Sequence, residues 1–236
     1  MRCLILRLEA PLMAFGDVAV DEIRPTRRLP TLSMLTGLLG NAVGLDHREV
    51  DALQRLQERL RFAARLDRPG RVIVDFQTAE ITKKDPLWTT RGAPAERAGG
   101  DQSYVGPVIR HRHYVADAMV TVALALIPEN EPPTLDDLAS ALTRPERPLF
   151  LGRKGCPPAR PLLDRAPFDA RSLVAALATV PGEDAALVEF SDLPGEPAGR
   201  RVVEVADRRD WQTGFHAGMR RVRELILDRQ EAGDGR

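Results

Sequence analysis

Arg24, Arg27 and Arg28 stand shortly before a helix that the sequence predicts over residues 31–43. The guanidinium group of arginine binds phosphate through two parallel hydrogen bonds. The first backbone N–H groups of a helix have no partner within the helix, and the positive end of the helix dipole lies at the same place. The stretch therefore suits a phosphate-binding site, and it suits equally a solvated turn with ordinary surface arginines.

A second pair of cations, Arg153 and Lys154, lies between Gly152 and Gly155. Because glycine has no side chain beyond hydrogen, the backbone can approach a ligand closely while the two cations project from it. The alternative interpretation is a plain turn with surface charges. This segment is the second candidate for binding an anion.

Two histidines, His111 and His113, alternate with Arg110 and Arg112 in the stretch "RHRHY". Two histidines along one strand edge could act as the general acid and the general base of a metal-independent ribonuclease. They could equally stack on RNA or hydrogen-bond to it. A third possibility is that both are exposed strand residues and that the neighbouring arginines matter more.

Several other functional classes lack their motifs in this chain. "GLLGNAVG" has neither the Gly-x-Gly spacing nor the Lys-Ser/Thr ending of a nucleotide-binding loop, and no His-Glu-x-x-His motif is present. Cys3 and Cys156 are too few and too far apart for a zinc site or a disulfide framework, so each is expected to be a small core or turn residue. We therefore expect neither a metal nor a cofactor.

The charge and hydropathy of the chain limit where the protein can be located in the cell and which partners it can bind. The 34 basic and 34 acidic residues cancel, which argues against a chain that coats nucleic acid over its whole surface. The longest apolar run, "AMVTVALALI", is about half the length that crosses a bilayer. The first residues do not resemble a signal peptide. We therefore expect a cytoplasmic protein without membrane contact.

The first helix has clear boundaries and an unusual glycine content. Thr31 or Ser33 is its candidate N-cap, and Gly44 suits the left-handed residue just past its end. Gly37 and Gly40 each cost about 1 kcal/mol relative to alanine within a helix. We therefore expect a backbone or a ligand to come close to this helix.

Apolar patterns predict the other elements. We expect strands at 2–9, 114–127 and 148–154, a hairpin of 62–66 and 72–76 around a Pro-Gly turn, and helices over 48–60 and 134–144. The stretch from about 78 to 113 is polar, basic and interrupted by Gly and Pro. Such insertions tend to be functional or disordered.

The order of these elements indicates an α+β fold class. Without the second helix and the insertion, the order is strand, helix, strand, strand, helix, strand, which is the ferredoxin-like arrangement shared by RNA-recognition motifs. We expect this domain to cover residues 1–160. Residues 161–236 should form a smaller C-terminal β-rich domain, or an extension of the sheet, with a frayed tail. Its expected elements are a helix near 170–179, strands at 185–190 and 201–206, and a basic helix near 214–228.

Four segments occur in the order and at the spacing of one known family. They are "RLEAPLMAFG", "RPTRRLPTLSMLTGLLGNAVGL", "YVADAMVTVAL" and "PLFLGRKGCPPARPL". Together they resemble the signatures of the CRISPR-associated protein 5 family of subtype I-E, whose members are subunits of the Cascade surveillance complex. The resemblance covers residues 2–162 well and the remainder loosely.

The resemblance implies a specific RNA ligand. In this family a ferredoxin-like domain binds the repeat-derived 5′ handle of the CRISPR RNA and caps one end of the complex, as part of RNA-guided antiviral defence. The implied RNA-binding residues are Met13, Phe15, Arg24, Arg27, Arg28, Ser33, Arg153, Lys154, Gly155 and Cys156.

The insertion at about 78–113 matches the thumb of this family, a hairpin extension that reaches toward the neighbouring backbone subunit. Its implied contacts are Lys83, Lys84, Trp88, Arg91, Arg110 and Arg112. The implied partners are the CRISPR RNA handle, the adjacent backbone subunit and the large subunit of Cascade, and target DNA near the handle.

Catalysis divides the family. Its subtype I-C relatives cut the repeat RNA, whereas subtype I-E leaves this step to a separate endoribonuclease, so we expect no catalytic residues here. The alternative is a metal-independent endoribonuclease with His111 and His113 as catalytic residues. A third hypothesis, an RNA-recognition-motif protein that binds other RNA, is weakened because neither central strand has the aromatic pattern that stacks bases.

Overall fold

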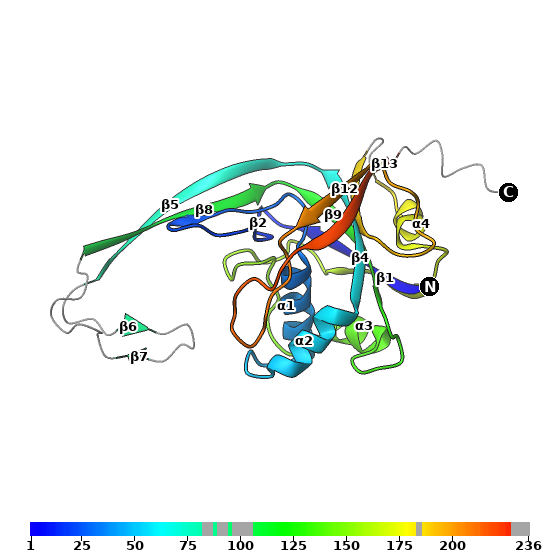
Figure 1. Cartoon of the computed structure of the whole chain (residues 1–236), viewed down its shortest axis with the longest axis horizontal. Helices are drawn as coiled ribbons and strands as arrows, with labels where there is room; N and C mark the ends of the chain where they lie inside the picture. The colour runs from blue at the N-terminus through cyan, green and yellow to red at the C-terminus, as the bar shows by residue number, and fades with distance from the viewer. Residues whose placement is uncertain (82–86, 89–93, 96–105, 183–185, 228–236) are drawn as a thin grey trace.

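The computed structural model describes residues 1–81, 87–88, 94–95, 106–182 and 186–227. Its centre is an antiparallel sheet of seven strands (Figure 1). From edge to edge the strands are β10 (Leu163–Asp169), β1 (Arg2–Glu9), β9 (Met119–Leu126), β4 (Leu60–Arg68), β11 (Ala186–Ser191), β13 (Arg220–Leu227) and β12 (Arg201–Val205).

The described ranges also contain four helices, which with the antiparallel sheet make the chain an α+β protein, as predicted. They are α1 (Leu32–Val43), α2 (Val50–Arg59), α3 (Leu135–Thr143) and α4 (Leu173–Ala178). All four lie where the apolar patterns predicted helices, and α3 begins with a capping box made by Thr134 and Asp137. None of the helices in these ranges has the length and apolar character needed to span a membrane.

Both faces of the central strands of the sheet are covered. Because side chains along a strand alternate between the two faces, one strand contributes to both cores. On β1, Leu4, Leu6 and Leu8 belong to the core that includes α1 and α3. Cys3 and Ile5, which point the other way, belong to a second core formed with α4. Figure 1 accordingly has α1 and α3 on one side of the sheet and α4 on the other.

Helix α1 has the boundaries that the sequence predicted. The Thr31 hydroxyl accepts a hydrogen bond from the Met34 N–H at 3.3 Å, and Gly44 adopts a left-handed φ of 87°. A Cβ on Gly40 would lie only 2.6 Å from Cδ2 of Leu53 in α2. The glycine therefore lets α2 pack closely on α1 through the Leu53 side chain, whereas the sequence suggested the approach of a backbone or a ligand.

Strands β5 (Arg71–Ile81) and β8 (Gly106–Ala116) form a long antiparallel hairpin, here called the β5–β8 arm, which projects from the sheet (Figure 1). The predicted hairpin of 62–66 with 72–76 is wrong. The first segment lies in β4, which is paired on both sides by β9 and β11, so β5 has no free edge of β4 to join.

Short strands accompany the arm. β2 (Leu12–Met13) and β3 (Ile23–Arg24) pair with the edge of β8 that faces away from β5. β6 (Leu87–Trp88) and β7 (Pro94–Ala95) pair with each other. The segment before α1 is thus tied to the base of the arm.

Two strand predictions in the middle of the chain are wrong. Residues 114–127 form the end of β8 and all of β9, because Asp117 between them has a left-handed φ of 55° and turns the chain from the arm into the sheet. Residues 148–154 form a loop, and the free edge of β1 is occupied instead by β10.

The C-terminal elements extend the same sheet. β11 pairs with β4, and β13 lies between β11 and β12. The predicted basic helix at 214–228 is wrong, because pairing on both edges makes residues 220–227 a strand. The division into two domains at residue 160 stays a prediction, and the tail at 229–236 lies outside the described residues.

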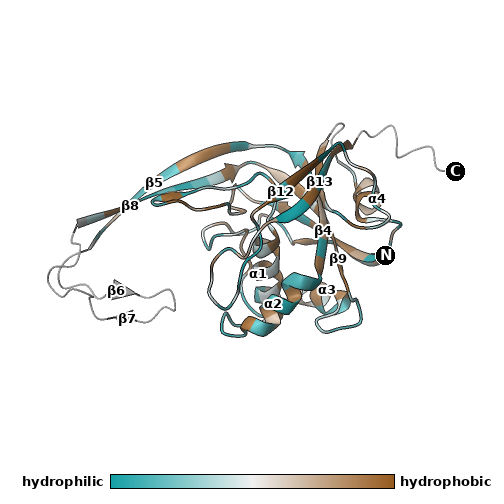
Figure 2. Ribbon diagram, viewed as in Figure 1, coloured by the Kyte–Doolittle hydropathy of each residue, from teal (hydrophilic) through white to brown (hydrophobic). Residues whose placement is uncertain are grey.

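The β5–β8 arm differs from the sheet in having an uncovered apolar face. Val74 and Phe76 of β5 are 56% and 58% exposed. His113 and His111 of β8 are their register partners and lie on the same face. Apolar and polar segments both occur along β5 and β8 in Figure 2.

Candidate nucleic-acid interface

Three segments that the sequence analysis singled out meet beside the N-terminal end of α1. The Arg27 N–H donates to the Gly16 carbonyl at 3.0 Å, and the Ala14 N–H donates to the Leu151 carbonyl at 3.0 Å. Residues 14–16, 24–33 and 151–156 thus form one surface, here called the loop face. The two predicted cationic segments lie side by side on it.

The first N–H groups of α1 are already occupied by the chain itself. The Leu32 N–H donates to the Asp207 carboxylate at 3.0 Å, and the Ser33 N–H donates to the Asp207 backbone carbonyl at 3.1 Å. Thr31 accepts the next N–H, so the N-cap is Thr31 and not Ser33. The prediction that the first N–H groups of α1 are free to bind a phosphate is wrong, because the Asp207 carboxylate of the same chain lies at this positive end of the helix dipole.

Arg27 belongs to a buried group of charges that reaches into the sheet. Its guanidinium pairs with the carboxylate of Glu189 on β11, and Arg220 of β13 lies 3.8 Å from the other Glu189 oxygen. Arg220 also pairs with Asp207 at 2.6 Å. Burial raises the pKa of Glu189, and the two arginines partly oppose that effect. We call Arg27, Glu189, Asp207 and Arg220 the buried charge cluster.

Arg153 likewise has partners within the chain. Its guanidinium donates to the carbonyls of Arg24 (3.0 Å) and His113 (2.8 Å) and lies 4.6 Å from the centre of the Tyr114 ring. A Cβ on Gly152 would lie 1.6 Å from the Ala14 carbonyl oxygen. This glycine therefore serves a close approach between two loops, whereas the sequence suggested a close approach to a ligand.

The remaining predicted RNA-binding residues of the loop face differ in their exposure to solvent. Arg28, Lys154 and Gly155 are exposed, and Arg24 is half-buried. Met13, Phe15 and Cys156 are fully buried in the core. Their side chains offer no surface to a ligand, so any RNA contact at those three positions would have to use the backbone.

The arm holds part of the predicted thumb. Arg110 and Arg112 are half-buried residues of β8, on the face opposite the two histidines. The backbone of Trp88 lies in β6, but its side chain is outside the described part of the structure. Lys83, Lys84 and Arg91 also lie outside the described residues.

The two histidines are on the apolar face of the arm. The His111 ring lies 5.3 Å from the Phe76 ring, and Val74 is opposite His113. Within the described residues, neither imidazole has a hydrogen bond to another side chain that would orient it. The described ranges also hold no group of His, Cys, Asp or Glu that could bind a metal ion.

The sequence analysis missed Glu189, Asp207 and Arg220. A signal for the first of them was present, since a lone carboxylate in the apolar stretch "ALVEFS" must find a cation or hydrogen-bond donor once it is buried. That signal could not name the partner, because Arg27 lies 162 positions away in the chain.

Comparisons with known proteins agree with this fold. The family model described as CRISPR-associated protein (Cas_Cas5) matches residues 3–223. The CRISPR system Cascade subunit CasD of Escherichia coli (strain K12) is 35% identical over 159 residues, which are 67% of this chain and 68% of that protein.

Two solved structures resemble the chain over nearly its whole length. One, titled "Crystal structure of Cas protein", has a TM-score of 0.65 at 27% identity and covers 99% of this chain and 98% of its own. A chain of a "CRISPR RNA-guided surveillance complex" has a TM-score of 0.66 at 24% identity, with coverage of 96% and 90%, and supports the fold. From the family match and the CasD identity together, this chain belongs to the CRISPR-associated Cas5 family.

Proposed function

We propose that this chain is a non-catalytic subunit of a type I-E CRISPR surveillance complex and binds the 5′ handle of the CRISPR RNA. The observation that carries the proposal is the loop face, where the exposed Arg28 and Lys154 come from two segments joined by the Arg153–Arg24 hydrogen bond. The relative CasD is itself a Cascade subunit, which supports the same role.

The sheet arrangement that supports this role is a ferredoxin-like, RNA-recognition-motif-like one. Its four strands would be β10, β1, β9 and β4, in that spatial order, with α1 and α3 as the two crossover helices on one face. The C-terminal strands β11, β13 and β12 would then be an addition at the β4 edge.

The β5–β8 arm is the candidate thumb. An exposed apolar face, with half-buried arginines on the opposite face, suits an extension that is completed by a neighbouring subunit and by nucleic acid. The partners proposed for it are the adjacent backbone subunit, target DNA near the handle and, for the complex as a whole, the large subunit.

The alternative function is a metal-independent endoribonuclease with His111 and His113 as its acid and base. Their placement together on one strand face favours it. Catalysis by such a pair needs side chains that are oriented by hydrogen bonds. The Phe76 and Val74 neighbours supply apolar contact and no orienting bond, which favours the non-catalytic role.

Co-purification tests the proposal. The tagged protein, expressed with its genomic neighbours, should co-purify with them and with RNAs whose 5′ ends derive from the repeat. Purified alone, it should leave repeat RNA intact both in EDTA and with added magnesium. Recovery of unrelated RNA would remove the handle assignment, and a single cleavage product lost in His111→Ala or His113→Ala would favour the nuclease.

A further inference from the structure

Strand β5 has a strand partner on only one of its two edges. It pairs with β8 along its whole length, from Arg71 opposite Ala116 to Ile81 opposite Gly106. Among the described residues no strand pairs with its other edge, which borders the arm in Figure 1. An edge of this kind presents N–H and C=O groups that can pair with another chain.

A comparison with β10 shows that the edge of β5 is unprotected. β10 lies at one edge of the seven-stranded sheet, contains Pro167 and has two register shifts in its pairing with β1. Proline and bulges both hinder the addition of another strand, because proline has no N–H and a bulge twists the edge. β5 is 11 residues long and has no proline, and its pairing with β8 has no register shift.

The directions of the backbone groups on β5 follow from a hydrogen bond on the far side of β8. The His111 N–H donates to the carbonyl of Glu22, next to β3, at 3.0 Å, so it points away from β5. Opposite residues in an antiparallel pair alternate between hydrogen-bonded and non-hydrogen-bonded pairs. Phe76, opposite His111, therefore turns its own N–H and C=O to the free edge. Every second residue of β5 does the same, which gives the set Val72, Val74, Phe76, Thr78 and Glu80.

This set includes the exposed apolar side chains of the arm. Val72, Val74 and Phe76 are all exposed, and alternate residues of a strand share one face. Ile23 of β3 is also exposed and extends this face across β8, through its register partner His111. A strand added to β5 would therefore pair with its backbone and extend an apolar face.

The chemistry of the edge selects a polypeptide strand. Its N–H and C=O groups match another peptide backbone, whereas phosphate oxygens only accept hydrogen bonds and would leave the carbonyls without a partner. The cations of β8 that would attract a phosphate, Arg110 and Arg112, lie on the opposite face of the arm. We infer that an extended segment of the neighbouring subunit adds to β5 as a strand, with apolar side chains beside Val74 and Phe76. This inference rests on the proposed role as a subunit of a complex and specifies how the arm is bound.

Hydrogen exchange resolved to single amides tests the strand addition. We would compare the free chain with the chain in the complex that co-purifies with its genomic neighbours. In the free chain the amides of Val74, Phe76 and Thr78 should exchange fast, because they point to the free edge. Those of Asp75 and Gln77, which point to β8, should exchange slowly in both samples. In the complex the fast set should slow at least ten-fold.

Thr78→Pro tests the same edge by substitution. It removes one N–H from the free edge and no hydrogen bond to β8. Thr78→Ala is the matched control, because it shortens the side chain and keeps the N–H. By native mass spectrometry the ratio of assembled to free chain should be roughly five-fold lower for the proline variant, the effect of one hydrogen bond. Val74→Pro should lower assembly relative to Val74→Ala in the same way, which keeps the test usable if Thr78→Pro disturbs the arm.

The outcomes separate this inference from the proposed function. Fast exchange of Val74 and Phe76 in an assembled complex, or equal assembly of each proline variant and its alanine control, would overturn the strand addition and leave the proposed function standing. Protection of these amides by handle RNA alone, or in the free chain at high concentration, would also overturn it and assign the edge to RNA or to a second copy. Failure of the natural chain to assemble with any neighbour would contradict the proposed function, and with it the partner that the strand addition requires.

Discussion

The seven-stranded sheet and the β5–β8 arm differ in how much of their apolar side chains they expose to solvent. Phe62 on β4 is 1% exposed and belongs to the core beneath α1, whereas Phe76 on β5 is 58% exposed. The difference follows from pairing, since β4 has strands on both edges and helices over both faces, and the arm has an open face. The sheet buries its central apolar side chains within the chain, whereas the arm leaves Val74 and Phe76 exposed.

The largest expected effect compares these two phenylalanines. Phe62→Ala should destabilise the protein by about 3–5 kcal/mol, because it leaves a cavity in a packed core. Phe76→Ala should change the free energy of unfolding by less than about 1 kcal/mol, since most of its ring is already in water. Urea denaturation of both variants measures the difference. Similar losses in the two variants would mean that the arm is part of the stability core.

The buried charge cluster should give the next largest effect. Glu189→Ala removes the carboxylate shared by Arg27 and Arg220 and leaves cations without a partner in the sheet. We expect a loss of about 3 kcal/mol, at the low end for a buried pair because Arg27 is partly exposed. Glu204→Ala on β12, an exposed carboxylate, is the matched control and should have almost no effect. Equal stability of the two variants would contradict the role assigned to the cluster.

A smaller effect concerns pH. Because burial raises the pKa of Glu189 in the folded state, the folded protein holds this proton at pH values where the unfolded chain has released it. The contribution of Glu189 to stability is therefore fully present below its unfolded pKa and is lost as pH rises through the folded pKa. The stability of the natural protein minus that of Glu189→Gln should fall as pH rises across this window. A difference that rises with pH would reverse the sign and contradict the account.

The sequence predicted the parts of the fold that depend on local signals. Thr31 and Gly44 mark the ends of α1, and these predictions are confirmed. The helix predicted over 134–144 is likewise present as α3, where the structure adds a capping box of Thr134 and Asp137. Strand pairing was not predictable in the same way. β4 and β5 are separated by a Pro-Gly turn that suits a hairpin, yet β4 finds its partners in β9 and β11.

The sequence singled out the segments that form the loop face, but it did not predict which groups their arginines contact. The two cationic segments do meet on the loop face, but Arg27 and Arg153 are held by Glu189 and by backbone carbonyls. Sequence spacing could not reveal these partners, because they come from distant strands that only the folded sheet brings together. The exposed Arg28 and Lys154 are consequently the better residues with which to test RNA binding.

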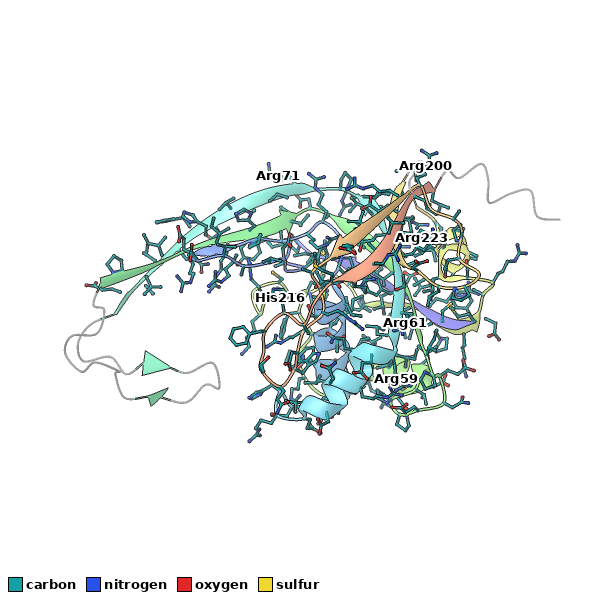
Figure 3. The ribbon with its side chains drawn as sticks, in the orientation of Figure 1. Arg59, Arg61, Arg71, Arg200, His216 and Arg223 are labelled. Carbon is teal, nitrogen blue, oxygen red and sulfur yellow. The ribbon has the colours of Figure 1, made fainter. Side chains whose placement is uncertain are left out.

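The salt dependence of handle binding tests the central claim most directly. The double variant Arg28→Glu, Lys154→Glu should bind repeat-derived handle RNA roughly 10–100-fold more weakly, with an unchanged melting temperature. Losing two phosphate contacts should make the slope of log affinity against log salt shallower by about 1.4. Arg171→Glu, Arg200→Glu, which changes the same net charge at exposed positions away from the loop face, should leave affinity and slope near their natural values (Figure 3 labels Arg200). Equal affinity and equal slope for the two double variants would contradict the assignment of the loop face as the RNA-binding surface.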